Sequence, residues 1–394
     1  MKINYNLILV FTFILVFNEF TLGRLFASYG EIGNNQILLA IRLFNVYVAL
    51  CGLYLYKKTK NIPFKESVKS IVLFGIGAFI FIEIMLKSII SIRYNFYVNS
   101  ISDSEKLGWK TIENVKLISK PMGYDRKIEF LTEKYGFRKF GKINTKKRKI
   151  LIIGDSFTEG VNVNNDEVYY NYLDTNKYEI FAYGCGGYGT LQEFMIIDEY
   201  FDEINPDILL IQFCSNDIIN NSYELERYNS KNNPHRIRPY LLNEDVKYLY
   251  PSMMNGALYR ILDYFYIFRI LKLQYLRFYK IEINEKNTNL DYLKDYYEKS
   301  ERITLKILEI IKKRSNSIPL FSFTTDYNEY SKKSIESIFK QSGYTYIPNV
   351  PEQLISAKNK GMKIDGMPYD AHWNHIGHKI AGKYISEFLL LNDI

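Results

Sequence analysis

Three apolar stretches, separated by short polar segments, dominate the first ninety residues. They span Leu7 to Leu22, Ile37 to Tyr56 and Ile71 to Ile92. Each approaches the roughly 20 residues that a helix needs to cross a bilayer. Lys2 precedes the first stretch as in a signal peptide, but no small-residue cleavage pattern follows it, and two more apolar stretches come next. The pattern predicts an uncleaved membrane anchor of three transmembrane helices over residues 1–96.

The basic residues around these stretches predict how the anchor is oriented. The segment between the first and second stretches has Arg24 as its one basic residue. The segment between the second and third carries five lysines: Lys57, Lys58, Lys60, Lys65 and Lys69. Because basic loops of this length stay in the cytoplasm, the N-terminus is predicted inside and everything after about Arg93 outside.

Charged side chains interrupt the three stretches at a similar depth. Glu19, Arg42 and Glu83 each lie about 18–21 Å from the cytoplasmic end of their stretch, at 1.5 Å per residue. Charges at that depth are costly and are expected to face one another. We favour structural pairing between helices. The alternative is a polar entry for a lipid-linked substrate.

Beyond residue 97 the pattern changes to short apolar runs that alternate with helical periodicity. A mixed, basic lead-in covers about 97–145. Helical patterns cover Thr190 to Phe201 and about Tyr292 to Lys313. The apolar runs are Arg148 to Ile153, Tyr178 to Tyr183, Ile208 to Phe213 and Ile318 to Phe323. Such runs are typical of buried parallel strands, and their alternation with helices predicts a doubly wound α/β sheet. Ligands of such sheets bind at the carboxyl ends of the strands.

Residues 220–290 break this alternation. They are rich in Asn and Tyr and then become a basic aromatic stretch from Ala257 to Ile283. The favoured interpretation is a helical lid inserted in the catalytic domain of residues 97–394 and packed on it. The alternative is an interfacial helix that rests on the bilayer.

Composition adds limits on function. The net charge of +8 over 394 residues is compatible with an anionic membrane surface or an acidic glycan, and no nucleic-acid-binding motif is present. The 35 Tyr and 26 Phe suit carbohydrate or lipid contacts, although biased codon usage explains them equally well. Cys51, Cys185 and Cys214 form no framework; buried free thiols are favoured over a disulfide between the last two.

Candidate chemistry follows the ends of the first three soluble runs. Gly154-Asp155-Ser156 places a serine where a strand ends and a helix begins, which exposes its hydroxyl. On its own this turn is a weak signal, and a helix N-cap is the favoured interpretation. Gly184 to Thr190 holds four glycines in its first six residues, as a close backbone approach or a plain turn requires. Asn216-Asp217 offers an amide that can donate to an oxyanion, or an ordinary turn.

A fourth block lies near the C-terminus, at Asp370-Ala371-His372-Trp373-Asn374-His375-Ile376-Gly377-His378. Three of the four histidines of the chain are here, and His235 is the other. A serine nucleophile needs a base and an orienting carboxylate, and His372 with Asp370 supplies both.

The four blocks together, in this order, resemble the SGNH (GDSL-type) hydrolase family over about residues 130–390. Tyr135-Gly136-Phe137-Arg138 is also similar to what precedes the first block in membrane-linked members. The resemblance implies a flavodoxin-like α/β/α sandwich and no cofactor. It implies a catalytic triad of Ser156, His372 and Asp370. The implied oxyanion hole consists of the Ser156 amide, the Gly187 amide and the Asn216 side chain.

Two departures from the family pattern bear on the reaction. The glycine that opens the third block is replaced by Cys214, and the last block has Asp-x-His in place of Asp-x-x-His. The shorter spacing resembles extracytoplasmic SGNH-like proteins that O-acetylate polysaccharides. The four blocks together predict a serine-dependent hydrolase of O-acyl esters, foremost O-acetyl esters, on a cell-surface glycan or lipid. The two departures leave the choice between hydrolysis and transfer open. The alternative is an O-acyltransferase that modifies a cell-surface polysaccharide together with a membrane acyl-transfer partner.

Two other classes compete with this interpretation. His372, His375 and His378 are spaced three apart, so one helical face could present them to zinc, although no H-E-x-x-H motif is present. A membrane-anchored envelope protein that only binds or assembles is the third class. Intact Ser156 and Asn216 argue against it.

Overall fold

The computed structural model describes part of the chain. The described residues are 14–15, 18–21, 35–58, 76–77, 79–84, 100–119, 126–228, 236–251, 265, 267–268, 291–315, 318–367 and 370–392. The chain divides into two compact units. The first comprises Met1–Asn95 with Met254–Tyr279, and the second comprises Phe96–Met253 with Lys280–Ile394.

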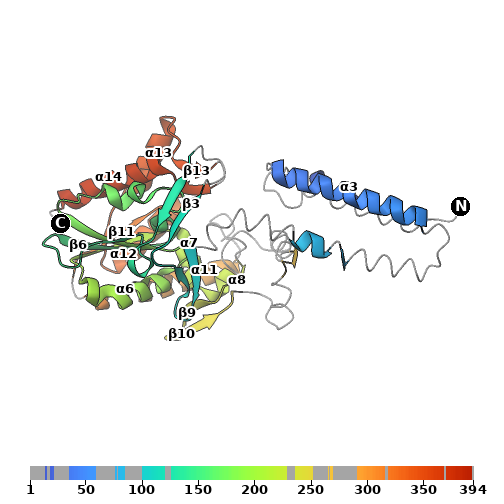
Figure 1. The fold of residues 1–394 in the computed structure, drawn as a ribbon. Helices are drawn as coiled ribbons and strands as arrows, with labels where there is room; N and C mark the ends of the chain where they lie inside the picture. The colour runs from blue at the N-terminus through green and yellow to red at the C-terminus, as the bar shows by residue number, and fades with distance from the viewer. Residues whose placement is uncertain are drawn as a thin grey trace. The chain divides into compact units, whose positions relative to one another are not determined.

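In the first unit, helix α3 spans Asn35–Lys58 (Figure 1). Arg42 on α3 donates two hydrogen bonds to Glu19, at 2.6 Å and 3.0 Å, as expected for pairing between charged groups of neighbouring stretches. Phe44, also on α3, stacks on Phe81, with ring centroids 5.1 Å apart. In the described part of the chain, no helix combines the length and apolar character needed to cross a membrane. Most of the first and third predicted spans lies outside the described residues.

Part of the 220–290 region also belongs to the first unit. The backbone N–H of Ile267 donates to the Glu83 carboxylate at 3.1 Å. Phe79 contacts the rings of Phe265 and Phe268, with centroids 5.6 Å and 6.0 Å away. One polar partner of Glu83 therefore comes from the segment that was expected to form a helical lid on the catalytic domain.

The second unit is built on a six-stranded sheet in the order β12-β11-β8-β6-β7-β5. Its strands are β5 (Lys139–Phe140), β6 (Arg148–Gly154), β7 (Tyr178–Gly184), β8 (Ile208–Phe213), β11 (Leu320–Thr324) and β12 (Thr345–Tyr346). All neighbours pair in parallel except β5, which is antiparallel to β7. Counted along the chain, the parallel strands have the order 2-1-3-4-5, which is the flavodoxin-like arrangement. The predicted doubly wound sheet and its four long strands are confirmed.

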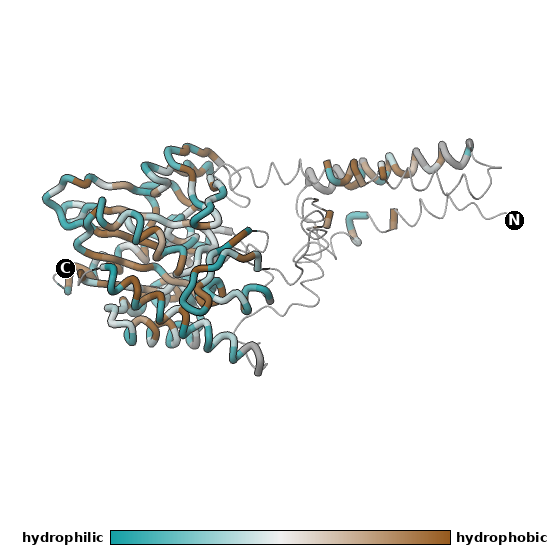
Figure 2. The backbone as a smooth tube through the Cα atoms, turned by 90° about the horizontal axis from the view of Figure 1, so that it is seen from below, coloured by the Kyte–Doolittle hydropathy of each residue, from teal (hydrophilic) through white to brown (hydrophobic). Residues whose placement is uncertain are grey.

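Helices cover both faces of this sheet (Figure 1). On one face lie α6 (Thr190–Ile204), α11 (Asp291–Arg314) and α12 (Glu329–Gln341), and on the other lie α13 (Val350–Asn359) and α14 (His375–Leu391). Alternate residues of β6 divide between the two cores: Leu151 and Ile153 pack with α6, whereas Ile150 and Ile152 pack with α14. The strands appear accordingly as the hydrophobic centre of the unit in Figure 2. The outcome is an α/β/α sandwich.

Among the described residues, four small hairpins accompany the sandwich. They are β1 with β2 (Ile101–Ser104 and Gly108–Thr111), β3 with β4 (Lys116–Ser119 and Ile128–Leu131), β9 with β10 (Arg238–Leu242 and Asp245–Leu249), and β13 with β14 (Asp365–Met367 and Asp370–Trp373). The first two occupy the lead-in that the sequence left irregular. The described beginning of the 220–290 region is helix α8 (Tyr223–Tyr228) followed by the β9–β10 hairpin.

Candidate active site

Ser156 stands at the carboxyl end of β6, where helix α5 (Ser156–Glu159) begins. Asp155 caps this helix by accepting the Phe157 N–H at 3.1 Å. The side-chain oxygen of Gln212, on neighbouring β8, accepts from the Asp155 N–H at 3.2 Å and from the Thr158 hydroxyl at 2.9 Å. These hydrogen bonds attach the turn to the central strand β8. The backbone that carries the half-buried Ser156 side chain is therefore held in place.

A glycine on the next strand permits this arrangement. A Cβ on Gly184 would lie 2.1 Å from the backbone nitrogen of Glu159 and 2.8 Å from the carbonyl oxygen of Asp155. Contacts that short do not occur, so any side chain at Gly184 would push the serine turn away from β7. Gly184, the first glycine of the second block, therefore lets the ends of β6 and β7 pack closely.

His372 lies against the serine. Its Nε2 atom is 2.6 Å from the Ser156 Oγ atom, within hydrogen-bond distance. The imidazole packs on the Phe157 ring at a centroid distance of 4.8 Å, and Trp373 packs on the same ring at 4.9 Å. Trp373 is fixed in turn by donating its Nε1–H to the Tyr327 hydroxyl at 3.1 Å. With its proton on Nδ1, His372 can accept the serine proton at Nε2.

Asp370 belongs by its backbone to β14, where it pairs with Met367. Its side chain lies outside the described residues, as do His235 and the side chain of Cys51. Its role in orienting His372 therefore stays a prediction.

Asn216 approaches the serine turn from helix α7 (Ser215–Asn221), which follows β8. Its Nδ2 atom donates to the Asp155 carboxylate at 3.2 Å. Two hydrogen bonds fix the start of α7, on which Asn216 lies. Asp217 caps the helix by accepting the Cys214 N–H at 2.8 Å, and Asp326 accepts the Ser215 N–H at 2.7 Å. Nδ2 also donates to the Asp217 carboxylate at 3.5 Å, so two carboxylates orient the amide beside the serine turn. Its donation to a substrate oxygen stays a prediction.

Gly187 lies in the turn between β7 and α6, with φ of +76°. That left-handed conformation favours glycine. The preceding residue, Gly186, donates its N–H to the Glu159 carboxylate at 2.8 Å. The structure therefore connects the second block to the serine helix through a side chain that the sequence analysis did not single out.

Glu159 is fully buried, and its other carboxylate oxygen has no hydrogen-bond partner. Burial raises the pKa of Glu159 to about 7, against the opposing effects of the Gly186 hydrogen bond and of the nearby Arg138 and His372. Its position three residues after Ser156 on a one-turn helix is the sequence signal that could have placed it under the site. The glutamate was missed because acidic residues at helix starts are usually solvent-exposed.

Two more buried carboxyl groups are Asp217, on the same helix as Asn216, and Glu193, on α6. Burial raises the pKa of Asp217, and the neighbouring Glu193 carboxyl raises it further, because two negative charges so close would repel. Burial also raises the pKa of Glu193, whose two oxygens have no hydrogen-bond partner. The protein therefore favours the neutral form of these acids close to the site.

The zinc interpretation is wrong in its geometry. His372 lies on a strand, and His375 opens α14, so the three histidines share no helical face. His378 is buried between the rings of Tyr169 and Trp373, and burial lowers its pKa to about 3. Within the described ranges no group of three or more acidic, histidine or cysteine side chains could hold a metal ion.

The two cysteines of the second unit are free thiols. Cys185 is buried and Cys214 is half-buried. Burial raises the pKa of both thiols, which keeps them protonated and unreactive.

Comparisons with known proteins give weak likenesses. No family model matches the sequence, and no curated protein matches it. Among solved structures, TesA is similar at a TM-score of 0.35 and 8% identity, covering 61% of this chain and 98% of that one. An acetyl xylan esterase, AlAXEase, gives 0.35 and 13%, covering 61% and 99%. A GDSL-like lipase from Parabacteroides merdae gives 0.32 and 15%, covering 62% and 97%. At these values the likenesses add nothing to the geometry above.

Proposed function

We propose that this chain is a serine-dependent ester hydrolase of the SGNH type. The observation that carries the proposal is the 2.6 Å contact between the Ser156 hydroxyl and Nε2 of His372, at the carboxyl edge of a flavodoxin-like sheet. A serine is a weak nucleophile unless a base accepts its proton, and this pair has the required geometry.

The reaction proceeds in two steps. Ser156 Oγ attacks the ester carbonyl carbon while His372 takes the serine proton at Nε2. The tetrahedral intermediate collapses when the same proton passes to the leaving alcohol, which leaves an acyl group on Ser156. Water then attacks the acyl-enzyme and gives a proton to His372. As the second tetrahedral intermediate collapses, His372 returns that proton to Ser156 Oγ, which releases the acid and restores the free serine. Asp370 is the proposed orienting carboxylate.

The negative oxygen of each tetrahedral intermediate needs fixed donors. We assign this role to the amides of Ser156 and Gly187 and to the side chain of Asn216. Preorganised donors of this kind supply much of the rate enhancement, because they require no reorganisation when charge develops.

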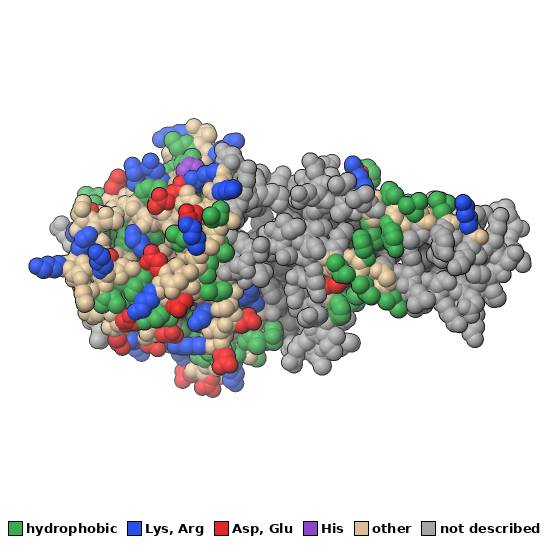
Figure 3. Space-filling model, in the orientation of Figure 1, with side chains coloured by type: hydrophobic (Ala, Val, Ile, Leu, Met, Phe, Trp, Pro, Cys, Tyr) green, Lys and Arg blue, Asp and Glu red, His purple; other side chains and the backbone are tan. Residues whose placement is uncertain are grey.

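For substrate, we propose O-acyl esters, foremost O-acetyl esters, of a glycan or lipid outside the cytoplasm. The support is the membrane anchor that the three apolar stretches and the lysine-rich segment predict for residues 1–96. On the face of the second unit seen in Figure 3, basic and acidic side chains are interspersed, and nucleic acid is not a proposed partner.

Acyl transfer is the second candidate, favoured by the Asp370-Ala371-His372 spacing. It shares the acyl-enzyme and differs in the second step, where a sugar hydroxyl replaces water. The full-length protein, given an acetylated oligosaccharide in water, releases acetate if it hydrolyses. A transferase instead moves the acetyl group to an added acceptor glycan.

The deciding experiment is labelling of the full-length protein, purified in detergent, with a fluorophosphonate probe. We expect one modified residue, Ser156, by peptide mapping. Ser156→Ala should abolish both labelling and turnover of a short-chain aryl ester. Ser337→Ala, which removes an exposed hydroxyl on α12, is the matched control and should retain both. Labelling elsewhere, or none, would leave a binding protein as the remaining interpretation.

A further inference from the structure

Three consecutive peptide groups around Gly187 are each fixed by one side chain. The N–H of Gly186 donates to Glu159 at 2.8 Å. The carbonyl of Gly186 accepts the Nε1–H of Trp109 at 3.3 Å, and the carbonyl of Gly187 accepts from Asn220 at 3.3 Å. The three side chains come from α5, β2 and α7, so the glycine turn is held from three separate elements.

The hydrogen bond from Trp109 acts on the peptide group between Gly186 and Gly187, which carries the proposed oxyanion donor. The carbonyl of Gly186 and the N–H of Gly187 belong to the same planar, trans peptide, in which the two bonds point in opposite directions. Because the indole holds the carbonyl on its own side, the Gly187 N–H must point away from Trp109. Within the turn that the Tyr188 N–H closes on the Cys185 carbonyl at 3.1 Å, this side-chain hydrogen bond therefore fixes which way the proposed oxyanion donor points.

Trp109 is itself held rigidly. Its side chain is 1% exposed. Its own carbonyl accepts the Tyr188 hydroxyl at 2.6 Å. Its ring lies under the Arg238 guanidinium, which is 4.8 Å from the ring centroid.

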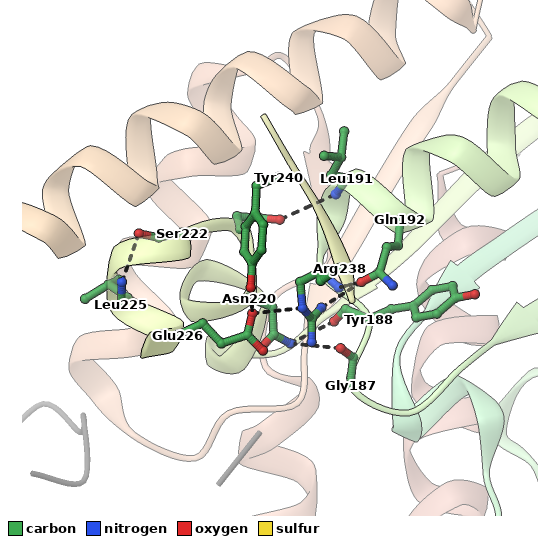
Figure 4. A network of polar contacts seen from close by, with 12 residues as sticks. Gly187, Tyr188, Leu191, Gln192, Asn220, Ser222, Leu225, Glu226, Arg238 and Tyr240 are labelled. Carbon is green, nitrogen blue, oxygen red and sulfur yellow. Dashed lines mark hydrogen bonds and ion pairs between the residues drawn. The ribbon is translucent and has the colours of Figure 1, made fainter. Parts of the chain in front are cut away.

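Arg238 is fixed by a buried polar network, shown in Figure 4. Its Nε atom lies 2.8 Å from the Glu226 carboxylate, and both side chains are 1% exposed. Its Nη1 atom donates to Gln192 at 2.6 Å, and Tyr240 donates its hydroxyl to the same glutamate. Its contacts with Glu226 and Gln192 hold the guanidinium over the Trp109 ring.

We propose that Trp109 is a positioning residue for catalysis, which orients the Gly187 N–H toward the oxyanion. The proposal rests on the ester hydrolase function proposed above. It joins the β1–β2 hairpin and the Arg238 network to the active site, although none of these residues belongs to the four sequence blocks.

The test compares Trp109→Phe with wild type in the full-length protein. Phenylalanine keeps a ring under Arg238 and loses the donor. We expect kcat for an aryl ester to fall about 10-fold or more, up to the roughly 10²–10³-fold that loss of a whole oxyanion donor gives, with KM unchanged. The rate constant for fluorophosphonate modification of Ser156 should fall by a similar factor.

Because Trp109 is buried, a second variant separates positioning from folding. Replacing Trp109 with benzothienylalanine exchanges the indole N–H for sulfur and keeps the ring shape. Tyr344→Phe is the matched control, since it removes one buried hydrogen bond to a carbonyl, that of Leu308 at 3.1 Å, far along the chain from the site. The control should retain kcat. Full activity in both Trp109 variants would overturn the proposal.

The amide resonance of Gly187 provides a readout that needs no turnover. It should shift in both Trp109 variants and stay in place in Tyr344→Phe. If wild type labels nowhere, the proposed function fails, and this resonance still decides the positioning. An unmoved Gly187 resonance in the Trp109 variants would refute it whatever the enzyme does.

Discussion

Glu159 gives the sharpest quantitative prediction. Its pKa is raised from the ordinary 4.5 to about 7, with burial as the largest cause. Between these two pH values the folded chain keeps a proton that the unfolded chain releases. The favourable contribution is therefore complete below pH 4.5 and is lost as the pH rises through about 7. The difference between the two pKa values corresponds to about 3 kcal/mol at 1.36 kcal/mol for each unit.

The perturbation is Glu159→Gln, which has almost the same shape and cannot ionise. Its amide oxygen can still accept the Gly186 N–H. Its NH₂ group replaces the oxygen that has no partner, which costs about 1–3 kcal/mol at every pH. The quantity to follow is therefore the change with pH. Relative to wild type, the free energy of unfolding of Glu159→Gln should increase by about 3 kcal/mol from pH 4.5 to pH 8.

The assay is urea unfolding of the full-length protein in detergent, followed by tryptophan fluorescence. The chain has two tryptophans, Trp109 and Trp373, and both are buried in the second unit. The signal therefore reports that unit alone. Exposed Glu309→Gln is the control for loss of one carboxylate. A difference between Glu159→Gln and wild type that stays constant within about 0.5 kcal/mol across the range would refute the buried, protonated state that we describe.

Three further predictions follow from the same geometry. Asn216→Ala should lower kcat by about 10²–10³-fold with little change in KM, measured on an aryl ester; near-normal turnover with reduced stability would remove Asn216 from the site. Gly184→Ala should destabilise the second unit by about 1–3 kcal/mol in the same urea assay, because its Cβ would overlap Glu159; an unchanged midpoint would contradict that packing. Burial lowers the pKa of His378 to about 3, so below pH 6.5 the unfolded chain binds a proton that the folded chain does not, and the free energy of unfolding should fall with the pH. His378→Gln should reduce this loss of stability in acid. An identical acid titration of the variant would count against the burial.

The sequence predicted the parts of this molecule that depend on local pattern. Runs such as Ile208 to Phe213 are apolar except for one glutamine, as is typical of a strand buried on both faces, and the structure has β8 there. The glycine and serine of the first block could be placed because a parallel strand end fixes where its turn lies. The contact of Ser156 with His372 spans 216 positions, and the order of the blocks was the sole sign of it.

What the sequence could not predict depends on contacts across the chain. Trp109 lies in a lead-in with no periodicity, and its proposed positioning role rests on a hydrogen bond to Gly186, 77 positions away. Strand β12 has two residues, too few to show a pattern. The zinc interpretation failed because spacing alone does not reveal that a strand ends between His372 and His375.

The division of the chain into two units has a consequence for its biosynthesis. The first unit takes its last segment from residues 254–279, so the chain passes between units three times, after residues 95, 253 and 279. On a ribosome the first unit therefore cannot be completed until most of the second has been made. The contact between Glu83 and Ile267 closes a loop of 184 positions, a separation that slows folding. A chain shortened to begin at residue 96 would expose Phe265 and Phe268 without Phe79, and aggregation is the expected result.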